Sequence, residues 1–383
     1  MANLSTCPPL TRASVVEAHG VVARHVHRTP VVTNRTLSAM ASRAGTAAEL
    51  EGTRWAGRTP AAPKIRLWFK CENLQRVGAF KARGAFHAVE RLVREEGWVA
   101  GGGREKGVVT HSSGNHAQAL ALAARENGIT AHIVMPTISM PQKIAATKGY
   151  GANVIFSGST SAEREEVAAR VMAETGARLV PPYDHPDIML GQGTMGLELQ
   201  EQVAEMMAEE ARASGKAAAK RGLDAIMAPC GGGGMLSGVA LSCEGTGIRV
   251  FGAEPSHQGA DDGKRGYYGG ARIPSVSTLT VADGLRTPVG AHPWAVIYER
   301  RLVAGMYSVT EEEIVAAMRL VLERCKMVAE PSACVPLAVA LFDEEFRAMV
   351  EREAGEEGWD LGLVLSGGNV GVDAIGRMFG GTS

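Results

Sequence analysis

The sequence predicts an α/β fold with a parallel β-sheet that has helices on both faces, as two domains or as one large domain with a second lobe. Short β-branched or apolar runs alternate with longer helical patterns along most of the chain. Such a repeated strand–helix–strand order is typical of parallel sheets covered on both faces. The 383 residues and the hydrophobic content of 45% suffice for a large buried core. The 47 glycines exceed the usual share of roughly 7% and indicate tight turns or close backbone approach to a ligand.

The pattern places the strands in short apolar runs separated by helical stretches. Strands are predicted at Ile65–Lys70, Gly107–His111, Ala131–Met135, Asn153–Phe156, Arg178–Pro181, Ala225–Ala228, Ile248–Ala253 and Leu361–Leu365. Helices are predicted at Ala82–Arg94, Asn115–Glu126, Ser161–Thr175, Thr194–Ala211 and Leu236–Ser242. A further helix should begin after Thr310, because Thr310 and Glu313 have the spacing of a capping box.

Three other stretches lack this pattern. Ala41–Pro63 and Glu209–Lys220 are predicted to be surface additions, and the glycine-rich Gly97–Gly107 to be a linker between the lobes.

Charge and cysteine usage exclude several classes of protein. Forty Lys and Arg against 41 Asp and Glu give a net charge of -1, so bulk charge cannot hold nucleic acid or an anionic membrane. The six cysteines are scattered and show no metal-ligand spacing, which favours a reducing, cytoplasmic compartment. No apolar run reaches the roughly 18 residues of a membrane span, and no signal peptide is apparent at the start.

A run of four glycines is the first motif with chemical meaning. Gly231, Gly232, Gly233 and Gly234, followed by Met235, lie between a predicted strand and a predicted apolar helix. Backbone N–H groups without Cβ atoms in the way, at a helix N-terminus, form a cradle for a phosphate group. A flexible turn is the alternative. Gly191–Gly196 also matches a dinucleotide fingerprint, but no good strand precedes it, so we expect no dinucleotide site there.

A lysine and two polar segments complete the motifs. Lys81 stands just after a glycine-containing turn, at the start of a helical pattern. A helix N-terminus disfavours a cation and should lower the pKa of this amine, although a single lysine is usually a solvated charge. Ser112–Gln118 opens a helix after a strand and offers N–H groups to a carboxylate, or is a plain helix cap. Ser366–Asn369 follows the last strand, at the end where α/β proteins bind ligands, or is a tight turn.

Together and in this order, these motifs resemble the fold-type-II pyridoxal-phosphate enzymes. This tryptophan synthase β-like group includes the serine racemases and the threonine or serine dehydratases. The resemblance extends from about Ser14 to Val372. It implies a large cofactor-binding lobe from residues 1–103 and 185–383 and a small mobile lobe from residues 104–184, each with a mainly parallel sheet flanked by helices, and a homodimer. It also implies no C-terminal regulatory domain, because the chain ends soon after Ser366.

The resemblance also implies roles for individual residues. Lys81 would form the Schiff base with pyridoxal phosphate and move a proton at Cα on one face, and Ser113 would move it on the other. The cofactor would be held by Phe80 beneath the ring, by Asn115 at the 3-oxygen, by Gly231–Gly234 and Met235 at the phosphate, and by Ser366 at the pyridine nitrogen. The substrate carboxylate would be held by Ser112, Ser113, Gly114, Asn115, His116 and Gln118.

Ser366 narrows the expected reaction. A neutral serine cannot stabilise a protonated pyridinium as an aspartate would, so the ring is a weaker electron sink. This favours prompt loss of a β-hydroxyl after Cα–H removal and disfavours transamination. We therefore expect a serine racemase with serine or threonine dehydratase activity. The alternatives are a dedicated threonine, serine or 3-hydroxyaspartate ammonia-lyase, a specialised β-replacement enzyme, and a cofactor-binding protein without turnover.

A metal site is implied as well. Ala253–Asp262 resembles the racemase segment that binds magnesium or manganese through a glutamate, a backbone carbonyl and an aspartate. The best register gives Glu254, the Gly259 carbonyl and Asp261, with Ala260 and Asp262 as the neighbouring alternative. Such hard oxygen ligands suit Mg²⁺ or Mn²⁺. An acidic surface loop is the other interpretation.

Overall fold

Two β-sheets organise the chain in the computed structural model, which describes residues 3–380 except 113, 140 and 216–221. The larger sheet has six strands in the order β1-β2-β10-β7-β8-β9, and the smaller has four in the order β5-β4-β3-β6. Every strand pair is parallel except β1 with β2. The α/β class with mainly parallel sheets is therefore confirmed.

The described elements have the following bounds. The strands are β1 (Val31–Thr33), β2 (Ile65–Cys71), β3 (Val108–His111), β4 (Ala131–Pro136), β5 (Asn153–Ser157), β6 (Arg178–Leu179), β7 (Ala225–Pro229), β8 (Arg249–Pro255), β9 (Gly305–Val309) and β10 (Trp359–Leu365). The helices are α1 (Arg12–Val22), α2 (Arg35–Ser42), α3 (Ala47–Leu50), α4 (Lys81–Val93), α5 (Gly103–Lys106), α6 (Asn115–Glu126), α7 (Pro141–Gly149), α8 (Ser161–Thr175), α9 (Pro186–Ser214), α10 (Gly234–Cys243), α11 (Asp262–Gly269), α12 (Ala291–Trp294), α13 (Glu311–Leu320), α14 (Pro331–Phe342), α15 (Glu344–Ala354) and α16 (Val372–Phe379).

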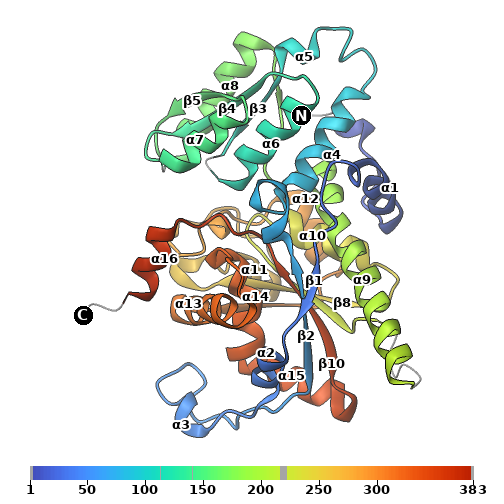
Figure 1. Cartoon of the computed structure of the whole chain (residues 1–383). Coiled ribbons are helices and arrows are strands. Elements are labelled where there is room, and N and C mark those ends of the chain that lie inside the picture. The colour runs from blue at the N-terminus through green and yellow to red at the C-terminus, as the bar shows by residue number, and fades with distance from the viewer. Residues whose placement is uncertain (1–2, 113, 140, 216–221, 381–383) are drawn as a thin grey trace.

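Helices cover both faces of the larger sheet (Figure 1). One face packs against α13 and α14, and the other against α9 and α10. The central strands β7 and β10 are therefore apolar at nearly every position, as expected for strands buried on both sides. The smaller sheet lies at the other end of the molecule, with α6, α7 and α8 around it.

Helix α4 joins the two halves, because it packs against α6 of the smaller half and against α9. Glycines allow the close contact with α9: a Cβ atom on Gly191 would lie 2.7 Å from the Cα atom of Gly84. The Gly191–Gly196 segment thus lies inside α9 and serves helix packing. The expectation that it is not a dinucleotide loop is confirmed.

Most predicted elements are present, with instructive differences. The sequence pattern missed β1 and β9, which are short or lack alternation, and it began α9 eight residues too late, at Thr194. The poor strand pattern before Thr194 belongs to a loop and the first turns of α9, which begins at Pro186 behind a His185 cap. The capping box of Thr310 and Glu313 is confirmed at α13.

The segments predicted as additions and linker prove partly structured. Residues 41–63 contain α3, and Leu50, Trp55 and Ala61 are buried. This segment is therefore not purely a surface embellishment, because its apolar side chains cover the larger half. In the second segment α9 ends at Ser214, and residues 216–221 lie outside the described part. The lobe boundaries stay a prediction. Among the described residues, no helix is long and apolar enough to span a membrane.

Candidate active site

The candidate residues gather where strands of the larger sheet end and helices begin. Ser366 follows β10, Gly231 follows β7 within two residues, and Lys81 begins α4. Parallel strands bring their carboxyl ends to one edge, which is where α/β folds bind ligands. Segments distant in the sequence therefore meet at this edge.

Lys81 presents a partly desolvated amine at this edge. Its Nζ donates a hydrogen bond to the Pro182 carbonyl oxygen at 2.6 Å. Burial lowers the pKa of Lys81 to about 8, and the nearby Glu330 carboxylate partly opposes this effect. The direction agrees with the sequence argument, but the cause is desolvation rather than the helix N-terminus. Such an amine is deprotonated part of the time near neutral pH and can act as a nucleophile.

Phe80 and Ser366 hold Lys81 against the end of β10. The Phe80 backbone N–H donates to the Ser366 carbonyl oxygen at 3.0 Å, and the Lys81 Nζ lies 5.1 Å from the centre of the Phe80 ring. Ser366 is buried, and the residue after it forms a β-bridge with Ala79. The two motifs thus form one local structure, although 285 positions separate them in the sequence.

Asn115 belongs to a polar network that sequence analysis did not find. Its Nδ2 donates to Glu330 Oε1 at 2.9 Å, and its Oδ1 accepts from Asn369 Nδ2 at 2.8 Å. Asn369 also donates to the Val77 carbonyl oxygen. The side chain of Asn115, at the start of α6 in the smaller half, is therefore fixed by two residues of the larger half.

Glu330 is the functional residue that the sequence pattern missed. Burial raises the pKa of its carboxyl group to about 8, with a further increase from Asp283, while the Asn115 hydrogen bond acts in the opposite direction. Glu330 thus holds its proton more strongly than an ordinary carboxyl group, and its charge when ionised raises the pKa of Lys81. The sequence feature that marks Glu330 is its position directly before Pro331, at the start of α14. This pattern is typical of an ordinary helix start and does not indicate a functional residue.

The four glycines form a tight turn that side chains cannot enter. Gly233 has φ +81°, a conformation that favours glycine. A Cβ atom on Gly232 would lie 2.3 Å from Cγ of Tyr183, and one on Gly234 would lie 2.9 Å from the Tyr183 carbonyl oxygen. The turn leads into α10, whose first N–H groups have no partner within the helix. These features fit a phosphate cradle.

The predicted substrate segment is only partly described. Ser112 follows β3, and its hydroxyl accepts a long hydrogen bond from the Gly114 N–H at 3.4 Å. Ser113 lies outside the described residues. His116 and Gln118 are buried within α6, and His116 Nε2 lies 3.0 Å from the Val180 carbonyl oxygen. Burial lowers the pKa of His116 to about 3, so its ring is neutral.

The acidic segment places its carboxylates close together. Glu254 is fully buried and accepts hydrogen bonds from the Gly263 and Lys264 N–H groups. Burial raises its pKa well above the usual value, and Asp262 and then Asp261 raise it further. Burial also raises the pKa of Asp262 to about 6.

One arginine contacts the two other members of the first predicted register. Arg265 donates to Asp261 Oδ1 at 3.0 Å and to the Gly259 carbonyl oxygen at 2.8 Å. Asp262 accepts instead from the Val289 backbone N–H. Of the two aspartates, Asp262 is thus the buried one next to Glu254.

Comparisons with known proteins agree with this geometry. Residues 53–365 match the family described as "Pyridoxal-phosphate dependent enzyme".

The chain belongs to this pyridoxal-phosphate dependent enzyme family.

Named relatives of the chain indicate which members of this family it resembles. The chain is 39% identical to a serine racemase of Arabidopsis thaliana, covering 96% of this chain and 95% of the relative. It is 36% identical to an L-threo-3-hydroxyaspartate ammonia-lyase of Saccharomyces cerevisiae, covering 97% of both. The solved structure of maize serine racemase matches with a TM-score of 0.78 at 38% identity, over 96% of both chains. The relatives of this pyridoxal-phosphate dependent enzyme are thus racemases and ammonia-lyases.

The described residues fit the cofactor of this family. The glycine turn leaves no space for Cβ atoms and leads directly into the N-terminus of α10, where free N–H groups suit a phosphate. The Lys81 amine with its lowered pKa suits attachment to an aldehyde.

Proposed function

We propose that this enzyme is a serine racemase that also eliminates water from serine or threonine. The observation that carries the proposal is the meeting of Lys81, Ser366 and the glycine turn at one edge of the larger sheet. The high identity to serine racemases over nearly the whole chain supports the substrate class.

Lys81 is the proposed attachment point and the proton carrier on one face of the substrate Cα. When bound, pyridoxal phosphate supplies an electron-withdrawing ring that weakens the Cα–H bond. The Lys81 Nζ would accept the Cα proton. Its lowered pKa keeps part of the amine neutral, which this step requires.

Ser113 is the proposed proton carrier on the opposite face. Proton removal on one face and return on the other inverts the configuration at Cα. Loss of the β-hydroxyl as water after the same proton removal gives instead an enamine, which then takes up one water molecule to yield a 2-oxo acid and ammonia. The two outcomes thus share their first proton transfer.

The environment of the cofactor ring favours these outcomes over transamination. Ser366 stands where the ring nitrogen is expected, and its neutral hydroxyl cannot hold that nitrogen protonated as a carboxylate would. Asn115, whose side chain is held by Glu330 and Asn369, is the proposed contact of the 3-oxygen.

A divalent cation at the acidic segment is part of the proposal. Glu254, with a pKa raised by burial next to Asp262, offers a site whose charge Mg²⁺ or Mn²⁺ would neutralise. The contacts of Arg265 with Gly259 and Asp261 favour the register with Ala260 and Asp262 over that with Gly259 and Asp261.

Assembly and compartment are proposed on general grounds. We infer a homodimer, as the family resemblance implies. A cytoplasmic setting is supported by the six cysteines, all free in the structure.

A second function has its own support. The Saccharomyces cerevisiae relative, similar over 97% of both chains, is an L-threo-3-hydroxyaspartate ammonia-lyase. A dedicated ammonia-lyase would use the same Lys81 and cofactor contacts but would release little inverted amino acid.

A single time course separates the two functions. L-serine is incubated with the enzyme, with and without magnesium, and D-serine and pyruvate are measured together. D-serine formation that rises with magnesium is the expected result. Pyruvate without D-serine, together with faster turnover of L-threo-3-hydroxyaspartate, would replace the racemase by an ammonia-lyase.

A further inference from the structure

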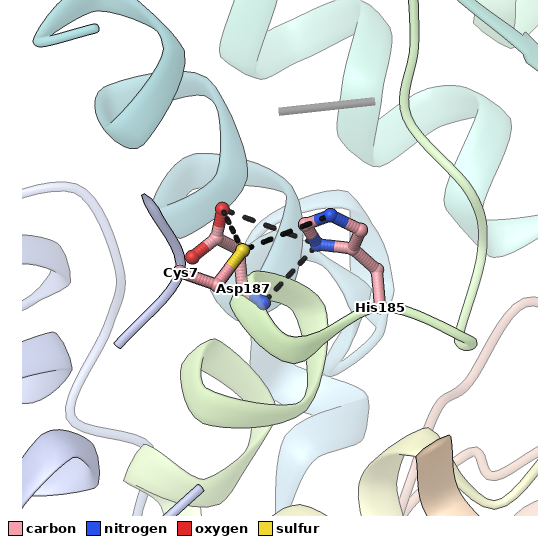
Figure 2. Close-up of side chains that lie close together, drawn as sticks. All are labelled: Cys7, His185 and Asp187. Atoms are coloured by element: carbon pink, nitrogen blue, oxygen red, sulfur yellow. Dashed lines mark hydrogen bonds and ion pairs between the residues drawn. The ribbon is translucent and has the colours of Figure 1, made fainter. Parts of the chain in front are cut away.

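A second group of reactive side chains lies away from the candidate active site. Cys7 comes from the N-terminal segment, while His185 and Asp187 come from the start of α9 (Figure 2). His185 and Asp187 are buried and Cys7 is partly buried. None of the three has a role in the proposed reaction.

The three side chains point toward one another (Figure 2). Cys7 Sγ lies 4.0 Å from His185 Nε2 and 3.8 Å from Asp187 Oδ2. Asp187 Oδ2 lies 3.9 Å from His185 Nδ1. One ligand atom from each residue lies within 4.8 Å of the others. Among the described residues, this is the one group of three or more histidine, cysteine or acidic residues with such spacing.

These separations are close to those of metal ligands, and the two that involve sulfur also lie within the range of weak thiol hydrogen bonds. The approach of Asp187 Oδ2 to His185 Nδ1 is too long for a hydrogen bond between oxygen and nitrogen. Bonds of about 2.3 Å to sulfur and about 2.0–2.1 Å to nitrogen place tetrahedral zinc ligands about 3.3–3.6 Å apart. Cys7 approaches Nε2 of His185 and Asp187 approaches Nδ1, so only one of these ring nitrogens would serve as the ligand. Since one ligand atom from each residue lies within 4.8 Å of the others, shifts of roughly one ångström would bring the three atoms onto one ion.

We propose that Cys7, His185 and Asp187 form a binding site for Zn²⁺ or a similar borderline-soft divalent ion. One thiolate and one carboxylate balance the two charges of the ion, and a neutral imidazole supplies the third ligand. This site is separate from the oxygen-rich segment around Glu254, which suits Mg²⁺.

The groups around the three side chains determine which proton and which hydrogen bonds a bound ion must displace. Burial and then Asp187 raise the pKa of the Cys7 thiol to about 12, so a bound ion releases a proton from the thiol. His185 Nδ1 accepts the Asp187 N–H at 3.2 Å, and Arg91 donates to Asp187 Oδ1 at 3.4 Å. The Arg91 contact uses the other carboxylate oxygen and leaves Oδ2 directed at Cys7.

A small hollow adjoins two of the three side chains. It has room for about one water molecule and is lined in part by His185, Asp187, Leu92 and Pro181, but not by Cys7.

The ion would fasten the N-terminal segment to a stretch that supports the active site. Residues just before His185 contact the catalytic machinery: the Pro182 carbonyl accepts from Lys81, and Tyr183 packs on the glycine turn. An ion that binds only the folded chain also stabilises it. The expected role is therefore to rigidify this stretch.

Zinc binding to the holoenzyme tests the proposal directly. The enzyme is freed of metal with a chelator, dialysed against Zn²⁺ in excess Mg²⁺, and its zinc content is measured. One zinc per chain is expected in the parent and in Cys325→Ser, a matched change at another partly buried cysteine. Cys7→Ala and Asp187→Asn should each lose this ion. Equal zinc in the parent and in Cys7→Ala would overturn the site.

Two further measurements keep the result independent of folding and turnover. Cofactor absorbance confirms that each variant is folded holoenzyme. X-ray absorption at the zinc edge should show one sulfur at about 2.3 Å and the remaining nitrogen and oxygen ligands at about 2.0–2.2 Å. A shell without sulfur would exclude Cys7 and with it the proposal.

Discussion

Two buried lysines near α4 have opposite surroundings. Lys70, at the end of β2, is fully buried and donates to three acceptors, which are Thr29 O at 2.8 Å, Glu198 Oε2 at 2.7 Å and Gln202 Oε1 at 2.8 Å. Lys81, at the start of α4, donates to one acceptor among the described residues, the Pro182 carbonyl oxygen. An ammonium group carries three protons, so the described residues supply Lys70 with all of its acceptors and the partly exposed Lys81 with one.

Burial lowers the pKa of both lysines, so burial alone does not mark the reactive one. The difference lies in the partners. Glu198 and Glu72 offset the desolvation of Lys70, and Arg83 joins the same cluster by contacting both carboxylates. The desolvation of Lys81 is offset by the charge of Glu330 alone. The comparison teaches that a buried amine is available for chemistry where its hydrogen-bond partners are too few.

The largest expected effect is on Lys81. Lys81→Ala should abolish the absorbance of bound cofactor and lower turnover of L-serine on the order of 10³-fold or more, because it removes both the attachment point and a proton carrier. Lys70→Met should keep cofactor absorbance and most turnover. A comparable loss of turnover in a folded Lys70→Met enzyme would contradict the proposed difference between a structural Lys70 and a reactive Lys81.

The structural cluster should instead respond in stability. Arg83→Met leaves Glu72 and Glu198 buried without their guanidinium partner, so the free energy of unfolding should fall by roughly 3–5 kcal/mol. Urea denaturation measures this fall. Arg76→Met is the matched control, because Arg76 pairs with Glu126 at a partly exposed site and should cost less than about 1 kcal/mol. Similar losses in both variants would contradict the role of the buried cluster.

Glu330 should give the enzyme a pH-dependent stability. Its pKa is raised from 4.5 to about 8, so the folded chain retains a proton that the unfolded chain releases above about pH 4.5. The stability contribution is full below this lower value and is lost as pH rises through about 8, at up to roughly 1.4 kcal/mol per pH unit. Glu330→Gln should therefore reduce the loss of stability between pH 5.5 and 7.5 in the cofactor-free chain.

Urea denaturation of the parent and of Glu330→Gln at both pH values gives this difference. Other buried carboxyl groups with raised pKa values, such as Asp343 and Asp262, are unchanged in the variant and cancel in the comparison. An identical pH dependence in the two proteins would show that Glu330 is already ionised.

The smallest effect is expected at a surface lysine. Lys143 of α7 pairs with Asp283 at 2.8 Å, and both side chains are partly exposed. Lys143→Met should change the free energy of unfolding by less than about 1 kcal/mol, because solvent screens exposed pairs. Thermal unfolding checks this, and a larger loss would mean that the pair acts as a buried contact.

Sequence patterns predicted the strands that carry the site because those strands are buried on both faces. Continuous apolar runs such as Leu361–Leu365 have few other interpretations, and the polar residues that follow them identify the strand ends. The predicted strands missed β1 and β9, since three-residue or non-alternating segments carry no period. Glu330 was missed for a related reason, because a single acidic residue before a proline has no distinctive spacing.

The sequence by itself determined the α/β class and the glycine turn before α10, because both depend on neighbouring residues. Lys81 was identified by the resemblance of the combined motifs to a family, and its role stays a prediction. Only the tertiary structure decided which lysine is left short of partners and which carboxyl group lies beside Asn115. It also brought Cys7 to His185 and Asp187 across 178 positions. The burial of a side chain and its hydrogen-bond partners depend on segments that are distant in the chain. No local sequence pattern can therefore predict them.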